Sequence, residues 1–162
     1  MFEVKEKDTA RVRSYISLAT DINNINFLWG IKDKETDSYP LYALKKTPSG
    51  KPILSGDVIT AASQQYDYVG NPAIVLKMNE VGARIWERMT EKAYVQRSFI
   101  AMVLNDEVYS APGVSSGPIM GGMTELSGNF TIEEAQDLAN ILSTSGEIPK
   151  MKILTFDVQK IE

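Results

Sequence analysis

Residues 99–112 of this chain read FIAMVLNDEVYSAP and carry its strongest local pattern. The first six of these residues are apolar and are rich in side chains that favour strands over helices. Alternate residues fall on opposite faces of such a strand: Ile100, Met102 and Leu104 on one face, and Phe99, Ala101 and Val103 on the other. Because both faces are apolar, we expect an interior strand that is covered on both sides.

The residues after this strand predict a tight hairpin. Asn105 and Asp106 both tolerate positive φ angles, which a two-residue turn requires. Residues 108–111 would then return antiparallel to the first strand. Pro112 has no N–H group to donate to a strand ladder, so the second strand should end there.

A glycine-rich segment follows, and it reads GVSSGPIMGGMTELSG over residues 113–128. Its glycines and Pro118 exclude a long regular element, so we expect short strands at residues 119–120 and 123–126 between turns.

The sequence FTIEEAQDLANIL, residues 130–142, predicts a capped helix. Thr131 and Glu134 have the spacing of a capping box, in which each side chain bonds the backbone N–H of the other residue. The helix carries an apolar stripe formed by Ala135, Leu138, Ala139, Ile141 and Leu142. Ser145, Gly146 and Pro149 predict its end.

Weaker patterns predict further elements on both sides of this region. Strands are expected at residues 2–4, 27–31, 41–44, 66–69, 73–78 and 152–161, and helices after Asp8 to about residue 23 and after Asn79 to residue 92. Gly70 and Asn71 fit a type II′ turn between two of these strands. Residues 58–62 fit a strand or a short helix. The second helix should turn Val81, Ile85, Trp86 and Met89 inward. The mixture predicts an α+β fold, with a mostly antiparallel sheet and helices packed on it.

The composition suits a globular chain of one domain, or of one domain with an appendage. The chain has 162 residues, of which 43% are hydrophobic and 23% charged. Its formal net charge of −4 argues against nucleic acid or an anionic membrane as a partner. The sequence lacks cysteine and histidine, which excludes disulfides, thiolate or imidazole metal sites and catalysis by these side chains within this chain. No apolar run approaches the roughly 18 residues of a membrane-spanning helix, and the charged residues 1–8 do not resemble a signal peptide.

Short motifs stand in a fixed order along roughly two thirds of the chain. They comprise residues 42–45, 54–60, Gly82-Ala83, Thr90, residues 101–105 and 108–112, Gly121-Gly122, residues 126–128, Phe130-Thr131, and residues 135–139 and 145–149. Each motif is common by itself, but the ordered set resembles the first periplasmic domain of SecD and of the fused SecDF proteins. These are accessory components of the bacterial protein-export machinery.

The resemblance implies a division of the chain into two parts. Residues 1–33 and 150–162 would belong to a membrane-proximal, partial ferredoxin-like base, and residues 34–149 would form a head subdomain inserted in it. The chain would then be an excised soluble piece of a multi-pass inner-membrane protein, on the periplasmic side of the membrane.

The resemblance also implies a role without catalysis or cofactors. The head would bind emerging, unfolded preprotein and assist export that the proton gradient drives. The SecYEG channel and SecF would be partners through the full-length protein, and this piece would not itself contact the membrane. Our candidates for preprotein binding are Val114, Ile119, Met120 and Met123, since methionine adapts to varied partners and lies here beside glycines.

Two functions of other classes stay open at this point. Carboxylates at Asp57, Asp67, Asp106, Glu107 and Glu125 could supply a pair for a small hydrolase, although no spacing singles out a pair. The chain could also be a passive assembly module. The glycine-rich segment lacks the lysine that follows the last glycine of a phosphate-binding loop, so we interpret its glycines as turn formers.

Overall fold

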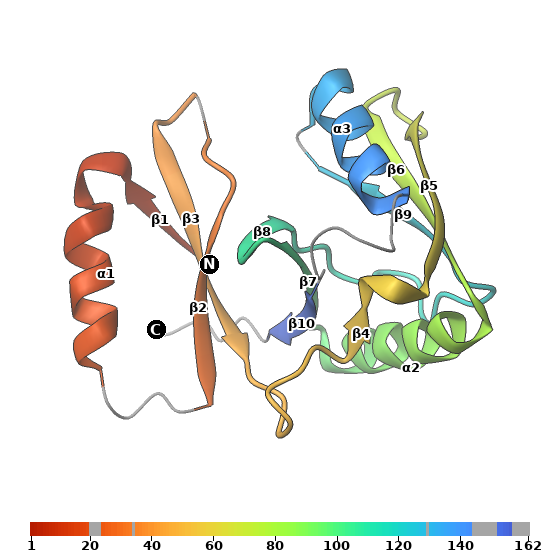
Figure 1. The fold of residues 1–162 in the computed structure, drawn as a ribbon, viewed down its shortest axis with the longest axis horizontal. Helices are drawn as coiled ribbons and strands as arrows, with labels where there is room; N and C mark the ends of the chain where they lie inside the picture. Colours follow the sequence, from red (N-terminus) through yellow and green to blue (C-terminus); the bar gives the residue numbers. More distant parts are fainter. Residues whose placement is uncertain (20–23, 34, 129, 144–151, 157–162) are drawn as a thin grey trace.

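The computed structural model describes residues 1–19, 24–33, 35–128, 130–143 and 152–156. Over these residues the chain forms two β-sheets and three α-helices, and the sheets lie at different ends of the molecule (Figure 1). The fold is α+β with almost entirely antiparallel strands, as predicted.

The larger sheet has seven strands in the order β1-β3-β2-β8-β7-β10-β4. Its strands are β1 (Phe2–Lys5), β2 (Ile25–Gly30), β3 (Ser38–Lys45), β4 (Leu54–Ser55), β7 (Phe99–Leu104), β8 (Glu107–Ser110) and β10 (Lys152–Phe156). All pairs are antiparallel except β2 with β8. Helix α1 (Thr9–Leu18) follows the short 3-10 helix η1 (Glu6–Asp8) and lies beside β1, β2 and β3 (Figure 1).

The smaller sheet has three strands in the order β5-β6-β9. These strands are β5 (Ile59–Tyr66), β6 (Pro72–Met78) and β9 (Met123–Ser127), and the 3-10 helix η2 (Gly56–Val58) precedes β5. Helix α3 (Ile132–Ser143) packs on β5 and β6, while α2 (Glu80–Gln96) contacts β4, β6 and β7. The smaller sheet and both helices occupy the same end of the molecule (Figure 1).

Strand β7 is the interior strand that its sequence predicts. It lies between β8 and β10, and five of its six residues are buried. Ile100, Met102 and Leu104 enter the larger apolar core, which α2, α3 and the smaller sheet enclose. Its other face, with Ala101 and Val103, belongs to a second core. Burial of both faces explains the uninterrupted apolar run.

The predicted hairpin and capping box are both confirmed. Asn105 and Asp106 have φ angles of 53° and 62°, and Leu104 lies opposite Glu107 across the turn. At the start of α3, the N–H of Glu134 donates to Thr131 Oγ1 at 3.1 Å, and the N–H of Thr131 donates to Glu134 Oε2 at 3.0 Å. Both patterns form locally, because the residues that each one joins are only a few positions apart in the sequence.

Helix α2 begins as predicted and ends later than predicted. The side chain of Asn79 accepts the N–H of Gly82, and the helix continues past residue 92 to Gln96, where Arg97 adopts a left-handed conformation. A Cβ atom on Gly82 would lie 2.7 Å from the side chain of Val58, so glycine permits close packing of α2 on η2.

Some predicted elements differ from those observed. Residues 66–69 form a strand only at Tyr66, because Asp67 accepts the N–H groups of Val69 and Asn71 and so builds a longer turn than the predicted type II′ turn. Residues 59–66 form the strand instead, after η2, so both alternatives for residues 58–62 are partly realised. Residues 119–120 form no strand.

Helix ends and faces also differ in places. Asp8 makes no capping bond and pairs with Arg11 instead, and α1 ends at Leu18 rather than near residue 23. Val81 is 60% exposed, whereas Trp86 and Met89 face the core as predicted. Ile141 is partly exposed, unlike the other members of the stripe on α3. Residues 145–149 and 157–161, which completed the predicted helix end and last strand, lie outside the described residues.

The predicted division at residue 33 stays a prediction. Strands from both predicted parts, such as β1 and β3, pair within the larger sheet. None of the helices in the described ranges is long and apolar enough to cross a membrane.

Candidate functional site

The glycine-rich rim, residues 113–123, lies against α2 and is anchored at both ends. At its start, the N–H of Ile100 donates to the carbonyl of Pro112 at 3.0 Å, and Phe99 pairs with Gly113. At its end, the N–H of Met78 donates to the carbonyl of Gly122 at 2.8 Å. The rim is therefore tied to both sheets.

A buried hydroxyl group holds the middle of the rim. Thr90 of α2 is completely buried, and its Oγ1 accepts the N–H of Ile119 at 2.9 Å. The same hydroxyl donates to the carbonyl of Trp86 at 2.9 Å. The amide of Ile119 finds its partner in Thr90, 29 residues away in the sequence, so this hydrogen bond joins the rim to α2.

The four candidate residues on the rim fall into two pairs. Val114 and Ile119 are partly buried and pack against the larger core. Met120 and Met123 point outward and are 68% and 57% exposed. A partner could therefore contact most of the side chain of each methionine, but not of Val114 or Ile119. Their role in binding preprotein stays a prediction.

A small apolar pocket lies where the two sheets and α3 meet. It is formed by side chains of β7, β8, β9, α3 and the segment before α3, namely Met102, Val103, Leu104, Tyr109, Ser110, Leu126, Phe130, Leu138 and Leu142. Tyr109 is the titratable residue of this lining. Burial, and then the nearby charge of Glu107, raise the pKa of its hydroxyl. The pocket therefore suits apolar contacts and offers no carboxylate for acid–base chemistry.

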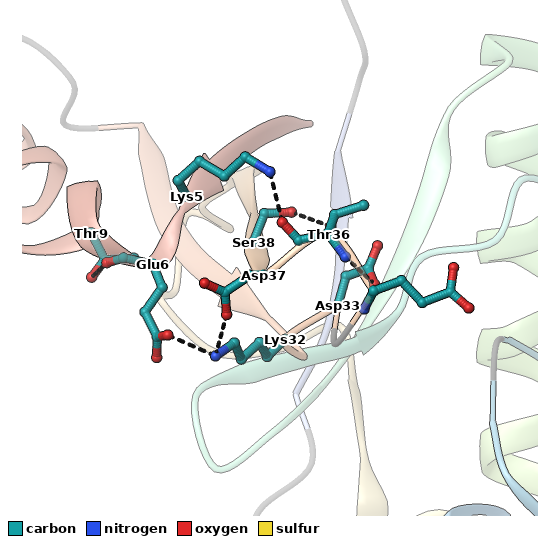
Figure 2. Close-up of polar contacts among 9 residues, drawn as sticks. Lys5, Glu6, Thr9, Lys32, Asp33, Thr36, Asp37 and Ser38 are labelled. Carbon is teal, nitrogen blue, oxygen red and sulfur yellow. Dashed lines mark hydrogen bonds and ion pairs between the residues drawn. The ribbon is translucent and has the colours of Figure 1, made fainter.

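A cluster of charged and polar side chains, which we call the loop clasp, lies at the other end of the molecule. Figure 2 shows Lys32 between Glu6 and Asp37, with Nζ at 2.7 Å from a carboxylate oxygen of each. Lys5 Nζ donates to the carbonyl of Thr36 at 2.6 Å. The backbones of Asp33 and Ser38 also pair. The loop clasp holds the loop before β3 against β1 and η1.

The charges of the loop clasp stabilise one another. Hydrogen bonds from Lys32 to Asp37 and to Glu6 raise the pKa of the Lys32 ammonium well above its ordinary value. The same contact with Lys32 lowers the pKa of Asp37. Bonds from the Thr36 hydroxyl and from the N–H groups of Glu35 and Thr36 lower the pKa of Asp33. All three groups stay charged at neutral pH, so ion pairs and hydrogen bonds hold this loop in place.

The possible catalytic carboxylates are spread over four parts of the fold, and Asp106 and Glu107 share one of them. Asp67 uses its carboxylate within its own turn, Asp57 lies in η2, Asp106 and Glu107 lie at the β7–β8 turn, and Glu125 lies on β9. In the described ranges, no group of three or more aspartate or glutamate side chains could hold a metal ion.

Two features of the site were not predicted from the sequence. The bond between Thr90 and Ile119 spans 29 residues, and the ion pair of Lys32 with Glu6 spans 26. No local spacing signals such contacts, since only the folded chain brings these residues together. The one sequence feature that singles out Thr90 is its place among the ordered motifs.

Comparisons with known proteins give a consistent result. Residues 31–149 match the family model described as "SecDF, P1 head subdomain". A protein translocase subunit SecD from Dictyoglomus turgidum is 39% identical over 104 residues, which cover 64% of this chain and 25% of that protein. The aligned part is thus a quarter of that relative's length.

Solved structures are similar over nearly the whole chain. A crystal structure of SecDF in a "Super-membrane-facing form" has a TM-score of 0.56 and 24% identity, over 93% of this chain and 22% of that one. A second structure, of "a membrane component SecDF that enhances protein export", has a TM-score of 0.53 and 23% identity, over 98% of this chain and 76% of that one. These structures support the fold.

Proposed function

The chain belongs to the family of the SecDF P1 head subdomain, and from this premise we propose that it binds unfolded preprotein during protein export. The observation that carries the proposal is the family match over residues 31–149. It is supported by two exposed methionines on the rim and by an apolar pocket without carboxylates, both of which suit weak contacts with many sequences.

In this proposal the chain acts without catalysis of its own. It lies on the periplasmic side of the inner membrane, as part of a longer membrane protein that works with the SecYEG channel and SecF. Residues 34–149 act as a head that moves against a base formed by residues 1–33 and 150–162. Proton movement through other parts of the protein drives that motion and assists export.

The proposal is tested by crosslinking to an unfolded polypeptide. A photoreactive amino acid is placed at Met120 or Met123 of the full 162-residue chain. Each protein is mixed with a secretory protein that reduction and alkylation keep unfolded. Placement at Tyr15, which is 64% exposed on α1, is the matched control.

We expect crosslinks from both methionine positions, few from the control position, and competition by other unfolded chains but not by folded proteins. Absence of crosslinks and of any measurable binding would contradict the proposal. Turnover of a substrate that is lost on replacing one of the carboxylates would favour the hydrolase. Concentration-dependent self-association without polypeptide binding would favour the assembly module.

A further inference from the structure

The smaller sheet has an outer edge that no described element covers. Strands β5 and β9 are the edges of this sheet. Helix α3 packs along β5, and Ser143 Oγ donates to the carbonyl of Ala62 on that strand at 2.8 Å. In the larger sheet, edge strand β1 carries the charged Glu3 and Lys5, and edge strand β4 has two residues. Charge and shortness discourage strand addition. Strand β9 has five residues and one charged side chain, Glu125, whereas β1 has four residues and two charges, so β9 is the best suited of the described edges.

The register of β9 determines which of its backbone groups point outward. In an antiparallel pair, every second residue exchanges bonds with the neighbouring strand, and the residues between them point their N–H and C=O groups away. Met78 lies opposite Gly122, and its N–H donates to the Gly122 carbonyl at 2.8 Å. Gly122 is thus a bonded position, as are Thr124 and Leu126, the second and fourth residues after it.

It follows that Met123, Glu125 and Ser127 direct their backbone groups away from β6. One bond agrees with this assignment, since the hydroxyl of Ser110 reaches the carbonyl of Ser127 from the outer side at 3.4 Å. In the described ranges we find no bond to the outward groups of Met123 or Glu125. In a strand, residues two apart are separated by about 6.8 Å. The outward groups of β9 therefore recur at the same interval as the donors and acceptors along one edge of an added strand.

Side chains along this edge place the small pocket beside it. The side chains of Thr124 and Leu126 point to the buried face, and those of Met123, Glu125 and Ser127 to the exposed face. Leu126 lines the apolar pocket. A strand added to β9 would carry alternate side chains on the same face as Leu126, and one of them would lie over this pocket.

We propose that the outer edge of β9 binds an extended segment of unfolded polypeptide by strand addition, with main-chain bonds to Met123 and Glu125. This rests on the proposed function and assigns it a surface and a mode of binding. An extended backbone is the occupant because its donors and acceptors alternate at the spacing of these outward groups. Main-chain bonds do not depend on the side chains of the bound segment, which suits a partner whose sequence varies.

The pocket adds a size limit to this mode of binding. Its volume is about 10 Å³, which is roughly the room for one water-sized sphere. A glycine or alanine fits beside Leu126 with little rearrangement, whereas valine or a larger side chain must displace the lining. Main-chain bonds therefore hold the bound segment, and the pocket limits the size of its side chain at one position.

The test uses the full chain and a synthetic ten-residue peptide that alternates alanine and threonine, with a lysine at each end. Glu125→Pro removes one outward N–H and leaves the bonds to β6 in place, since proline is tolerated at such edge positions. Glu125→Ala removes the same carboxylate and keeps the N–H. We expect Glu125→Pro to weaken peptide binding about tenfold, from the lost bond and the clash of the proline ring, and Glu125→Ala to change it less than twofold.

Modified peptides give a second measurement that needs no change in the protein. N-methyl groups on alternate residues block one edge of an extended peptide and leave the other free. A peptide methylated at alternate residues should therefore still bind through its free edge, whereas a peptide methylated at every residue has no main-chain donor and should not bind; the amides of Met123 and Glu125 should gain protection from hydrogen exchange when peptide binds.

The outcomes separate this inference from the proposed function. Binding with equal affinity for both variants and for peptides with and without complete N-methylation, or protection confined to other elements, would overturn strand addition at β9 and leave preprotein binding intact. Absence of binding to any peptide or unfolded protein would overturn both. Dimerisation of the chain through β9 without peptide would assign the edge to a second copy and overturn the inference.

Discussion

At the scale of single residues, Thr90 has the most consequential position in the structure. Its buried hydroxyl accepts the N–H of Ile119, so the rim depends on one side chain of α2 for this bond. A buried amide without a partner is costly, whereas a buried threonine in a helix is ordinary when its hydroxyl is satisfied.

Thr90→Val should therefore destabilise the chain through loss of this bond. We expect the free energy of unfolding to fall by about 1–3 kcal/mol, because the partly buried amide of Ile119 would lose its partner. Urea unfolding measures the change. Thr90→Ser keeps the hydroxyl and should lose less. A loss in Thr90→Ser as large as in Thr90→Val would show that the methyl group matters as much as the bond, and would contradict the prediction.

The adjacent glycines 121 and 122 offer a second residue-scale prediction. Both have positive φ angles, 80° and 70°, but a Cβ atom on Gly122 would lie 2.7 Å from the Cβ of Ala83, whereas one on Gly121 would meet no atom within 4 Å. Gly121→Ala should lower the free energy of unfolding by about 1 kcal/mol through backbone strain alone.

Gly122→Ala should lower it by about 2–4 kcal/mol, because the methyl group also pushes against α2. Thermal or urea unfolding of the two variants in parallel measures the difference. A smaller loss at Gly122 than at Gly121 would mean that the rim moves away from α2 without difficulty.

At the scale of elements, the β5–β6 turn is organised by Asp67. Its Oδ1 accepts the N–H groups of Asn71 and Val69 at 2.8 and 2.9 Å. These bonds, with the one from the N–H of Asn71 first, lower the pKa of Asp67 below its ordinary value of 3.8. The turn presents Tyr68 fully exposed, so its order does not come from apolar packing.

The turn should lose order in acid. A carboxylate whose pKa is lowered by folding contributes stability that is complete above pH 3.8 and is lost as the pH falls through the lower pKa of the folded state. NMR spectra of the amides of Val69 and Asn71 should therefore titrate below pH 3.8. In Asp67→Asn this titration should disappear. Persistence of the titration in that variant would assign it to another carboxylate.

At the scale of the whole molecule, β7 connects the two apolar cores. Ile100 belongs to the core beneath α2 and α3, and Val103 to the core beside β3 and β8. Neither core can open without exposing one face of β7, so the two ends of the molecule should unfold together.

The two tryptophans of the chain can test this. Trp29 lies on β2 against Tyr39, and Trp86 is a buried residue of α2. In variants that keep one tryptophan each, Trp29→Phe and Trp86→Phe, fluorescence should report the same response to each core substitution. Val103→Ala should lower the free energy of unfolding by about 2 kcal/mol and Ile100→Ala by about 3 kcal/mol.

Each substitution should shift the transition seen by both probes equally. A shift seen by one probe alone would mean that the two ends unfold independently. Trp29→Phe and Trp86→Phe without a core substitution give the reference values for each probe.

Features that depend on neighbours along the chain could be predicted from the sequence. The β7–β8 turn, the capping box of α3, the start of α2 and the two buried faces of β7 all follow from residues within one or two turns of each other. The α+β class follows from these elements, and the ordered motifs identify the family, since family motifs are mostly turn and packing positions.

Features that depend on distant residues required the folded chain. The division of the strands between two sheets, the bond from Ile119 to Thr90, the loop clasp and the outward groups of β9 involve partners 20 or more residues apart, or depend on which edge stays uncovered. The burial of Val114 and Ile119, beside exposed Met120 and Met123, is of the same kind. Hydrophobic and glycine patterns specify local shape, but burial depends on what the rest of the chain brings against a segment.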